Sequence, residues 1–286
     1  MGGGRWTSDR FRAYNAAVGR KVKADGALDS SYTAQDLFVS RSIQPELDPK
    51  NVIRECCDSE EHPNTIPVIL ALDVTGSMGS GAAEVAKKLN LVMTELYEKL
   101  NDVEFLVMGI GDLSYDRAPI QVSQFESDIR IAEQLDKIYF EGGGGGNSFE
   151  SYTAAWYFGL NHTKLDCHKR GKKGIIITMG DEPLNPYLPA KQLNKVTGDN
   201  VQGDVETKEL YSEAIKEFDL YHLAVDDRAT SYRHYSERIK KTFGEYFDDK
   251  HLITVKLDNI SSTIVDIVCG ESGDTSVSGT MKEISW

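Results

Sequence analysis

The stretch IPVILALDVTGSM, residues 66–78, decides the fold. Its branched apolar run up to Asp73 is typical of a buried strand in a parallel sheet. Closely spaced glycines then permit a turn before an amphipathic stretch, so Asp73, Thr75 and Ser77 are expected at the carboxyl end of a strand, where open α/β sheets bind ligands. One carboxylate and two hydroxyls suit a hard cation such as Mg²⁺. An ordinary turn, with Thr75 or Ser77 capping the next helix, is the simpler alternative.

The composition is that of a globular chain with an acidic balance. The 286 residues are 40% hydrophobic and 27% charged, and the net charge of −13 argues against general affinity for nucleic acid or anionic lipid. No apolar run approaches the length of a membrane span, and residues 1–12 lack the apolar core of a secretory signal. Four cysteines without framework spacing fit a reducing compartment. We therefore expect a cytoplasmic protein without a nucleic-acid or membrane partner.

Residues 1–65 show no sustained periodicity and are expected to form an N-terminal arm with one or two short helices. The first 25 residues carry six basic and two acidic side chains, so their charge is +4 while the rest of the chain carries −17. Such an arm gains most by folding onto an acidic surface, with Trp6, Phe11 and Tyr14 supplying buried area. That surface is either its own body or a neighbouring copy, which would make a homo-oligomer; a frayed terminus is the alternative.

From residue 66 to residue 269, strand and helix patterns alternate, which predicts a doubly wound α/β sheet. One short strand follows its predecessor too closely for a crossover helix, so it is expected to pair antiparallel at an edge of the mostly parallel sheet. Residues 270–286 are rich in Gly, Ser and Thr and are expected to form a loosely held C-terminal tail. The expected strands are 66–73, 103–112, 119–125, 173–181, 219–225 and 251–257, and the expected helices are 82–100, 129–138, 149–161, 206–219, 231–243 and one from 260 onward.

On these residues the chain resembles the von Willebrand factor A family. That family's metal-ion-dependent adhesion site begins with Asp-x-Ser-x-Ser after the first strand, and residues 73–77 here read Asp-Val-Thr-Gly-Ser. The family's third motif is an aspartate after the fourth strand; Asp181 matches it by position, with Glu182 beside it as a substitute. The resemblance covers residues 66–269 and implies a binding site and no catalysis.

The second motif of the family is normally a threonine after paired glycines, and this chain departs from it. The run Gly142–Gly146 is followed by Asn147 and Ser148. A variant in some members, Gly-Gly-Gly-Asp-x-x-Glu, places Asn147 at the ligand position and keeps Glu150, with Ser148 as the competing ligand. Asn147 supplies a carbonyl oxygen, which a hard cation accepts. The glycine run is no phosphate-binding loop of the P-loop type, because no Lys-Ser/Thr pair follows it.

The resemblance therefore implies a site for Mg²⁺ or Mn²⁺ with five protein ligands. Two aspartates balance the cation, and the remaining oxygens are neutral, so the metal can still attract one anionic oxygen. In the family that oxygen often comes from a Glu or Asp of a partner protein. We expect metal-dependent protein–protein interaction, as an assembly or scaffold component in a bacterial or phage-infected cell, and no enzyme activity. The expected ligands are Asp73, Thr75, Ser77, Asn147 and Asp181.

Three alternatives stay open. The chain could be an adaptor for a chaperone-like AAA ATPase, a pairing frequent among bacterial relatives, or a structural protein whose metal site is vestigial. It could also be a phosphatase of the haloacid-dehalogenase type, with Asp73 as the nucleophile and Asp181 as a magnesium ligand. Most soluble members of that superfamily have aspartate where Thr75 stands, and this chain offers no convincing candidate for their lysine.

Overall fold

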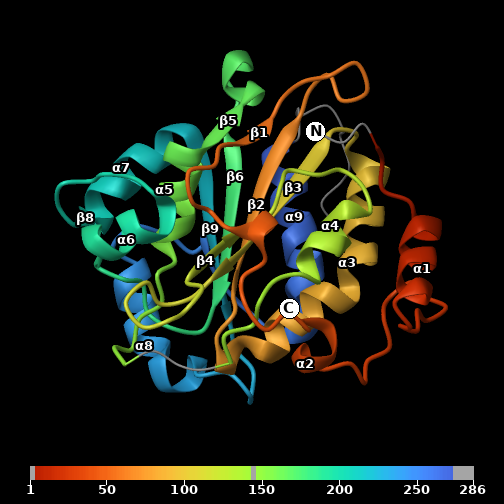
Figure 1. The fold of residues 1–286 in the computed structure, drawn as a ribbon, viewed down its shortest axis with the longest axis horizontal. Coiled ribbons are helices and arrows are strands. Elements are labelled where there is room, and N and C mark those ends of the chain that lie inside the picture. Colours follow the sequence, from red (N-terminus) through yellow and green to blue (C-terminus); the bar gives the residue numbers. More distant parts are fainter. Residues whose placement is uncertain (1–3, 143–145, 273–286) are drawn as a thin grey trace, which may run out of the picture.

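A six-stranded sheet forms the centre of the protein, in the order β10-β9-β6-β2-β3-β4. The structure is a computed structural model that describes residues 4–142 and 146–272 (Figure 1). Neighbouring strands are parallel except for β4, which pairs antiparallel with β3 at one edge, so the expected fold class is confirmed. The strands are β2 (Ile66–Asp73), β3 (Val103–Ile110), β4 (Ile120–Val122), β6 (Gly174–Gly180), β9 (Phe218–Val225) and β10 (Leu252–Val255).

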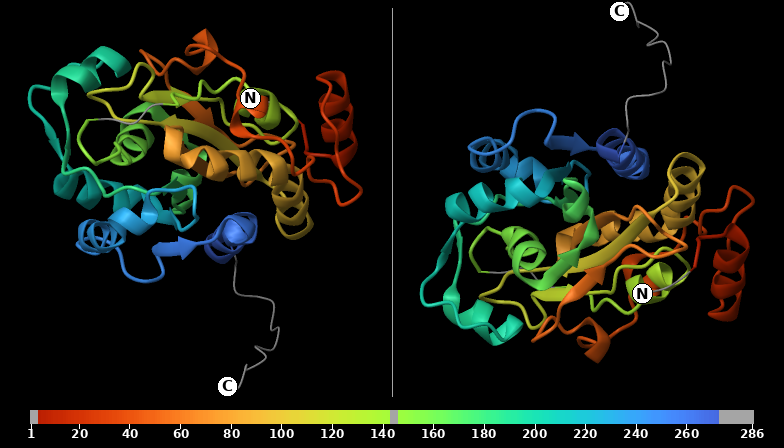
Figure 2. Two further views of the ribbon diagram at one scale, coloured as in Figure 1. Left: turned by 90° about the horizontal axis from the view of Figure 1, so that it is seen from below. Right: turned by 90° about the horizontal axis from the view of Figure 1, so that it is seen from above.

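Helices cover both faces of this sheet, as the two further views show (Figure 2). One face packs against α3, α4 and α9, and the other packs against α5, α7 and α8. Each helix was expected from its periodicity, within a few residues at its ends. Their bounds are α3 (Gly79–Lys99), α4 (Arg130–Leu135), α5 (Thr153–His162), α7 (Thr207–Glu217), α8 (Tyr232–Phe243) and α9 (Ile260–Ser272).

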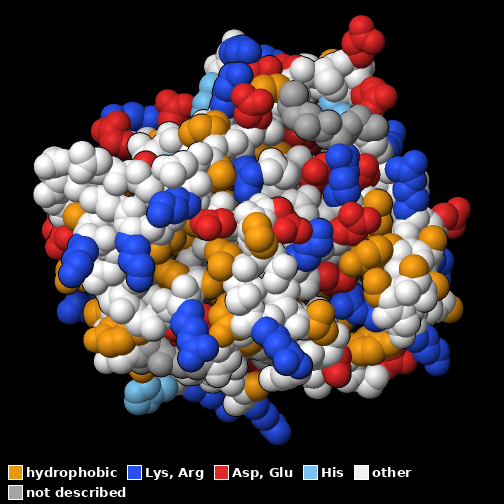
Figure 3. Space-filling model, viewed as in Figure 1, with side chains coloured by type: hydrophobic (Ala, Val, Ile, Leu, Met, Phe, Trp, Pro, Cys, Tyr) orange, Lys and Arg blue, Asp and Glu red, His pale blue; other side chains and the backbone are white. Residues whose placement is uncertain are grey.

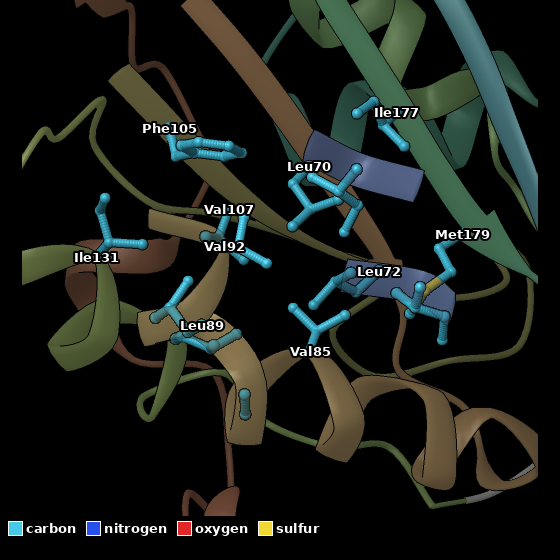
Figure 4. Packing of buried hydrophobic residues seen from close by; sticks show 14 of the residues in the cluster. Leu70, Leu72, Val85, Leu89, Val92, Phe105, Val107, Ile131, Ile177 and Met179 are labelled. Atoms are coloured by element: carbon cyan, nitrogen blue, oxygen red, sulfur yellow. The ribbon is translucent and has the colours of Figure 1, made fainter. Parts of the chain in front are cut away.

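Strand β2 is buried on both faces because it lies in the middle of the sheet. Its alternate side chains Leu70 and Leu72 point towards α3, where Val85, Leu89 and Val92 recur at three- and four-residue spacing (Figure 4). The side chains between them belong to the cluster on the opposite face. Two periodicities, of two residues in the strand and 3.6 in the helix, thus meet in one core and determine which side chains of β2 face α3.

Smaller elements complete the fold, and the sequence patterns did not predict most of them. Two-stranded sheets are formed by β1 with β5, in parallel, and by β7 with β8, antiparallel. Strands of two or three residues carry too few side chains to show alternation, which is why they escaped notice. The additional elements are α1 (Ser8–Ala17), α2 (Ala34–Leu37), α6 (Ala190–Thr197), β1 (Arg54–Cys56), β5 (Thr163–Leu165), β7 (Tyr187–Leu188), β8 (Val205–Glu206) and the 3-10 turns Pro45–Leu47, Gly76–Met78, Asp166–Arg170 and Leu257–Asn259.

Two further expectations concern the C-terminal tail and a membrane-spanning helix. Residues 270–272 complete α9, and the rest of the expected C-terminal tail lies outside the described residues. In residues 4–142 and 146–272, no helix has the length and apolar character needed to cross a membrane.

The N-terminal segment packs on helices of its own chain. Trp6 and Phe11 are buried, with 5% and 1% of their surface exposed, and the Trp6 indole N–H donates to Asn90 Oδ1 on α3 at 3.0 Å. Arg20 forms an ion pair of 2.6 Å with Asp136, directly after α4. Aromatic burial and opposite charge therefore both attach this segment, which runs beside α3 in Figure 1.

A second anchor holds the start of the described chain. The carbonyl oxygen of Gly4 accepts a hydrogen bond from Ser127 Oγ and lies 3.0 Å from His62 Nε2. His62 Nδ1 in turn lies 3.3 Å from Asp102 Oδ1. The serine hydroxyl and the imidazole both contact the same backbone carbonyl, and the aspartate contacts the imidazole. These three side chains therefore hold residue 4 in place.

We expect Trp6→Ala to release the N-terminal segment. The substitution removes a buried indole and the donor to Asn90, at a cost of about 3 kcal/mol. The measurement is the rate of tryptic cleavage within residues 5–23, which should rise well above that of the wild type. The control is Val18→Ala, because Val18 is 49% exposed and should leave the rate unchanged. Equal rates for Trp6→Ala and the wild type would contradict the packing described above.

Candidate functional site

Two aspartates meet at the carboxyl ends of neighbouring parallel strands. Asp73 is the last residue of β2, and Asp181 directly follows β6. The register pairs Leu72 with Met179, so the two aspartates emerge at the same edge of the sheet. Both side chains are 0% exposed. The strand pattern in the sequence therefore predicted this juxtaposition correctly.

Hydroxyl groups of the β2–α3 loop hydrogen-bond to these aspartates. The backbone N–H and the hydroxyl of Thr75 both donate to Asp73 Oδ1, at 2.9 and 2.6 Å. Ser77 Oγ donates to Asp181 Oδ1 at 3.1 Å and so connects the first loop to the second strand end. Neither hydroxyl caps a helix, which was the simpler interpretation of this turn. The loop is folded around the carboxylates.

A buried tyrosine completes the hydrogen bonds of Asp73. The hydroxyl of Tyr152 donates to Asp73 Oδ2 at 3.0 Å and accepts the backbone N–H of Glu182 at 3.3 Å. Tyr152 lies just before α5 and is 0% exposed. A Cβ atom at Gly180 would stand 1.9 Å from this hydroxyl, so only glycine leaves room for it. The missing side chain of Gly180 thus provides the space that the Tyr152 hydroxyl occupies.

Asp181 receives a further donor from the other end of the site. The backbone N–H of Ser231 donates to Asp181 Oδ2, and α8 begins at the next residue. The N-terminus of a helix carries partial positive charge, which favours an anionic group there. This contact was not expected from the sequence, because it depends on where the β9–α8 loop returns to the sheet.

Burial opposes the ionised state of the carboxyl groups gathered here. It raises the pKa of Asp73 to about 8, and the charge of Asp181 adds to that rise. The pKa of Asp181 is raised as well, with burial as the cause. Burial raises the pKa of Glu182 to about 7 and that of Glu150 to about 12, helped by neighbouring carboxylates. The surroundings of the site therefore do not supply enough positive charge to keep all of these carboxyl groups ionised.

The donor set fits a hard divalent cation. Carboxylate and hydroxyl oxygens are the ligands that such ions prefer, and Glu150 Oε2 is a buried oxygen without a hydrogen-bond partner among the described residues. Within the described residues, no three Asp, Glu, His or Cys side chains form a cluster that could hold a metal by themselves. A cation would therefore depend on the hydroxyls of Thr75 and Ser77 and on water, as well as on Asp73 and Asp181.

Asn147 and Ser148 of the second motif form a local turn, and their expected part in metal binding stays a prediction. Asn147 is half-buried, and its Oδ1 accepts the backbone N–H of Phe149 at 3.2 Å, while Ser148 adopts a φ of 61°. Among contacts between described residues, none joins Asn147 to either aspartate. The residues that follow reach the site: Tyr152 donates a hydrogen bond to Asp73. Glu150 lies close enough to Asp73 for the charge of that aspartate to raise its pKa. Tyr152 was missed because an aromatic residue in a helical pattern is ordinarily assigned to the core.

Comparisons with known proteins identify similar folds only. No protein-family model matches the chain, and no curated protein matches it significantly. Among solved structures, the pilus adhesin SpaC from Lactobacillus rhamnosus GG has 11% identity and a TM-score of 0.49, covering 77% of this chain but 31% of the adhesin. The vWF domain of the pilus tip protein Mfa5 from Porphyromonas gingivalis has 13% identity and a TM-score of 0.42, covering 74% and 98% of the two chains. The SpRpn10 VWA domain has 9% identity and a TM-score of 0.40, covering 70% and 93%.

We expect Tyr152→Phe to destabilise the protein by about 1–3 kcal/mol, because it leaves a buried carboxylate oxygen of Asp73 without its donor. The measurement is urea unfolding in the presence of EDTA. The control is Tyr157→Phe, which also removes a hydroxyl bonded to an aspartate, Asp199. That aspartate is 28% exposed and retains His162 as a partner, so the control should cost less. A larger loss in the control would contradict the role given to Tyr152.

Proposed function

We propose that this protein is an interaction module of the von Willebrand A type, whose binding of a partner protein depends on Mg²⁺ or Mn²⁺. The proposal is supported above all by one observation: Asp73 and Asp181 are buried side by side at adjacent strand ends, each with a hydroxyl from the same loop. Thr75 and Ser77 are the proposed neutral ligands, and Asn147 is the proposed ligand from the second motif. The partner would supply a carboxylate.

The chemistry of each ligand follows from its hydrogen bonds. A hydroxyl has one proton and two lone pairs, so Thr75 and Ser77 can donate to the aspartates and still offer oxygen to a cation. Two ionised aspartates balance a divalent charge, and the cation supplies an electrophilic centre that attracts one more anionic oxygen. The Ser231 N–H and the Tyr152 hydroxyl orient the aspartates through their remaining oxygens. These residues hold and position a ligand and transfer no group.

The phosphatase alternative is less well supported. A nucleophilic Asp73 would need an oxygen directed at a phosphorus atom. Most soluble members of the haloacid-dehalogenase superfamily also have aspartate two residues after the nucleophile, whereas this chain has Thr75, whose hydroxyl donates to Asp73 Oδ1. We therefore propose a non-enzymatic protein that serves as an assembly or scaffold component in the cytoplasm of a bacterial or phage-infected cell. An adaptor for an AAA ATPase would use the same site in the same way.

We expect the wild-type protein to bind Mg²⁺ or Mn²⁺ and Asp73→Asn to lose that binding, because the amide keeps the shape of the side chain but removes its charge. Isothermal titration calorimetry measures the affinity. Unfolding provides a second readout, since metal at 100 times its Kd should stabilise the wild type by about 2.7 kcal/mol. Asp226→Asn is the matched control, because Asp226 also follows a strand but pairs with Lys256. Equal affinity in wild type and Asp73→Asn would refute the site, and no binding by either would favour a vestigial site.

A second expectation concerns the motif that departs most from the family. If Asn147 supplies a ligand, Asn147→Ala should weaken metal binding, whereas Ser148→Ala should change it little. The same calorimetric titration measures both variants, and neither side chain is buried, so the fold should survive. The reverse order of affinities would assign the ligand to Ser148 and shift the motif by one residue.

A further inference from the structure

A cleft of about 520 Å³ lies beside the candidate site, on the other side of the β3–β4 loop. Its walls come from that loop, from α6 and from residues 43–50 of the N-terminal segment. Its apolar lining includes Leu113, Ala118, Ile120 and Val196. Figure 3 shows the face that carries β4 and α6, with several Lys and Arg side chains around it.

The charge around this cleft is opposite to that of the whole protein. Its lining includes two acidic residues, Asp48 and Asp116, and four basic ones, although the chain has a net charge of −13. Among ion pairs between described residues, none involves any of the four basic side chains. These side chains are Lys50, Arg117, Lys191 and Lys195.

The four basic residues come from three walls of the cleft. Lys191 and Lys195 are four residues apart on α6 and therefore lie on one face of that helix. Lys50 and Arg117 belong to the other two walls. Cations on three walls above an apolar lining suit a ligand that has several carboxylates and also apolar surface. A small inorganic anion would use the charge and leave the apolar lining uncovered.

The loop between the cleft and the candidate site is fixed in place. The backbone N–H of Leu113 donates to Ser151 Oγ at 3.0 Å, beside Tyr152. Tyr115 at the tip of the loop is 60% exposed, and its ring lies against Gly146. An exposed tyrosine beside a cleft is a common anchor for a protein partner, since it offers a rigid apolar surface with a polar end.

We propose that this cleft binds an extended acidic peptide segment of a protein partner, without a metal ion. The acidic side chains of the segment would meet the four basic side chains, and its apolar side chains would cover the lining of the cleft. Because the basic side chains are exposed, salt should weaken the attraction. The inference does not depend on the proposed metal site and goes beyond it, since chelation of metal leaves these residues unchanged.

The test uses the full chain in EDTA and a fluorescent peptide of alternating glutamate and leucine, with binding followed by anisotropy. The wild type should bind the peptide, and binding should weaken as salt rises. The double variant Lys191→Glu with Lys195→Glu should lose at least about tenfold in affinity for the peptide, because two attractive charges become repulsive. The matched control is Lys208→Glu with Lys241→Glu, which changes two exposed lysines of α7 and α8 by the same charge.

Each outcome decides the inference. A loss confined to the α6 variant, with unchanged thermal unfolding, supports it. An equal loss in both double variants would show that only the net charge matters, and would overturn it. Inorganic phosphate and a single-stranded oligonucleotide are titrated in parallel. If either binds through Lys191 and Lys195 while the peptide does not, the cleft takes another class of ligand and the inference is wrong.

Discussion

The burial of the Asp73 and Asp181 carboxyl groups at neighbouring strand ends is the constraint that shapes this edge of the sheet. Burying an ionised group without compensation is costly, so each aspartate oxygen must be given a donor. The donors come from three separate loops, through Thr75, Tyr152 and the Ser231 N–H. They reduce the cost without removing it, since the pKa of Asp73 remains raised to about 8. The site therefore lacks the positive charge that would let both carboxyl groups ionise.

The sequence predicted the parts of the fold that depend on long periodic patterns. The apolar run of β2 and the spacing of Val85, Leu89 and Val92 in α3 were sufficient to place Asp73 at a strand end. It could not show the contacts made across the fold, because no local pattern marks them. Tyr152 reaches Asp73 only through its place before α5, 79 residues further along the chain. The glycine run has no periodic pattern, so the place of Asn147 was predicted only from the resemblance to the family motif.

The basic N-terminal segment uses its aromatic residues within its own chain. Trp6 and Phe11 are covered by α3, and Arg20 is paired with Asp136. A homo-oligomer built through this segment, one alternative that the sequence left open, would require the segment to leave these contacts and to make equivalent ones on a neighbouring copy. Residues 43–50 from the same N-terminal region also form one wall of the basic cleft. The segment therefore adds binding surface to the sheet domain as well as covering its helices.

The fit between Gly180 and Tyr152 couples two motifs that are distant in sequence. Any side chain at position 180 would displace the tyrosine hydroxyl, and with it the hydrogen bond to Asp73. Changes at the two positions should therefore be non-additive. A larger residue at position 180 should be tolerated only where position 152 carries a side chain smaller than tyrosine.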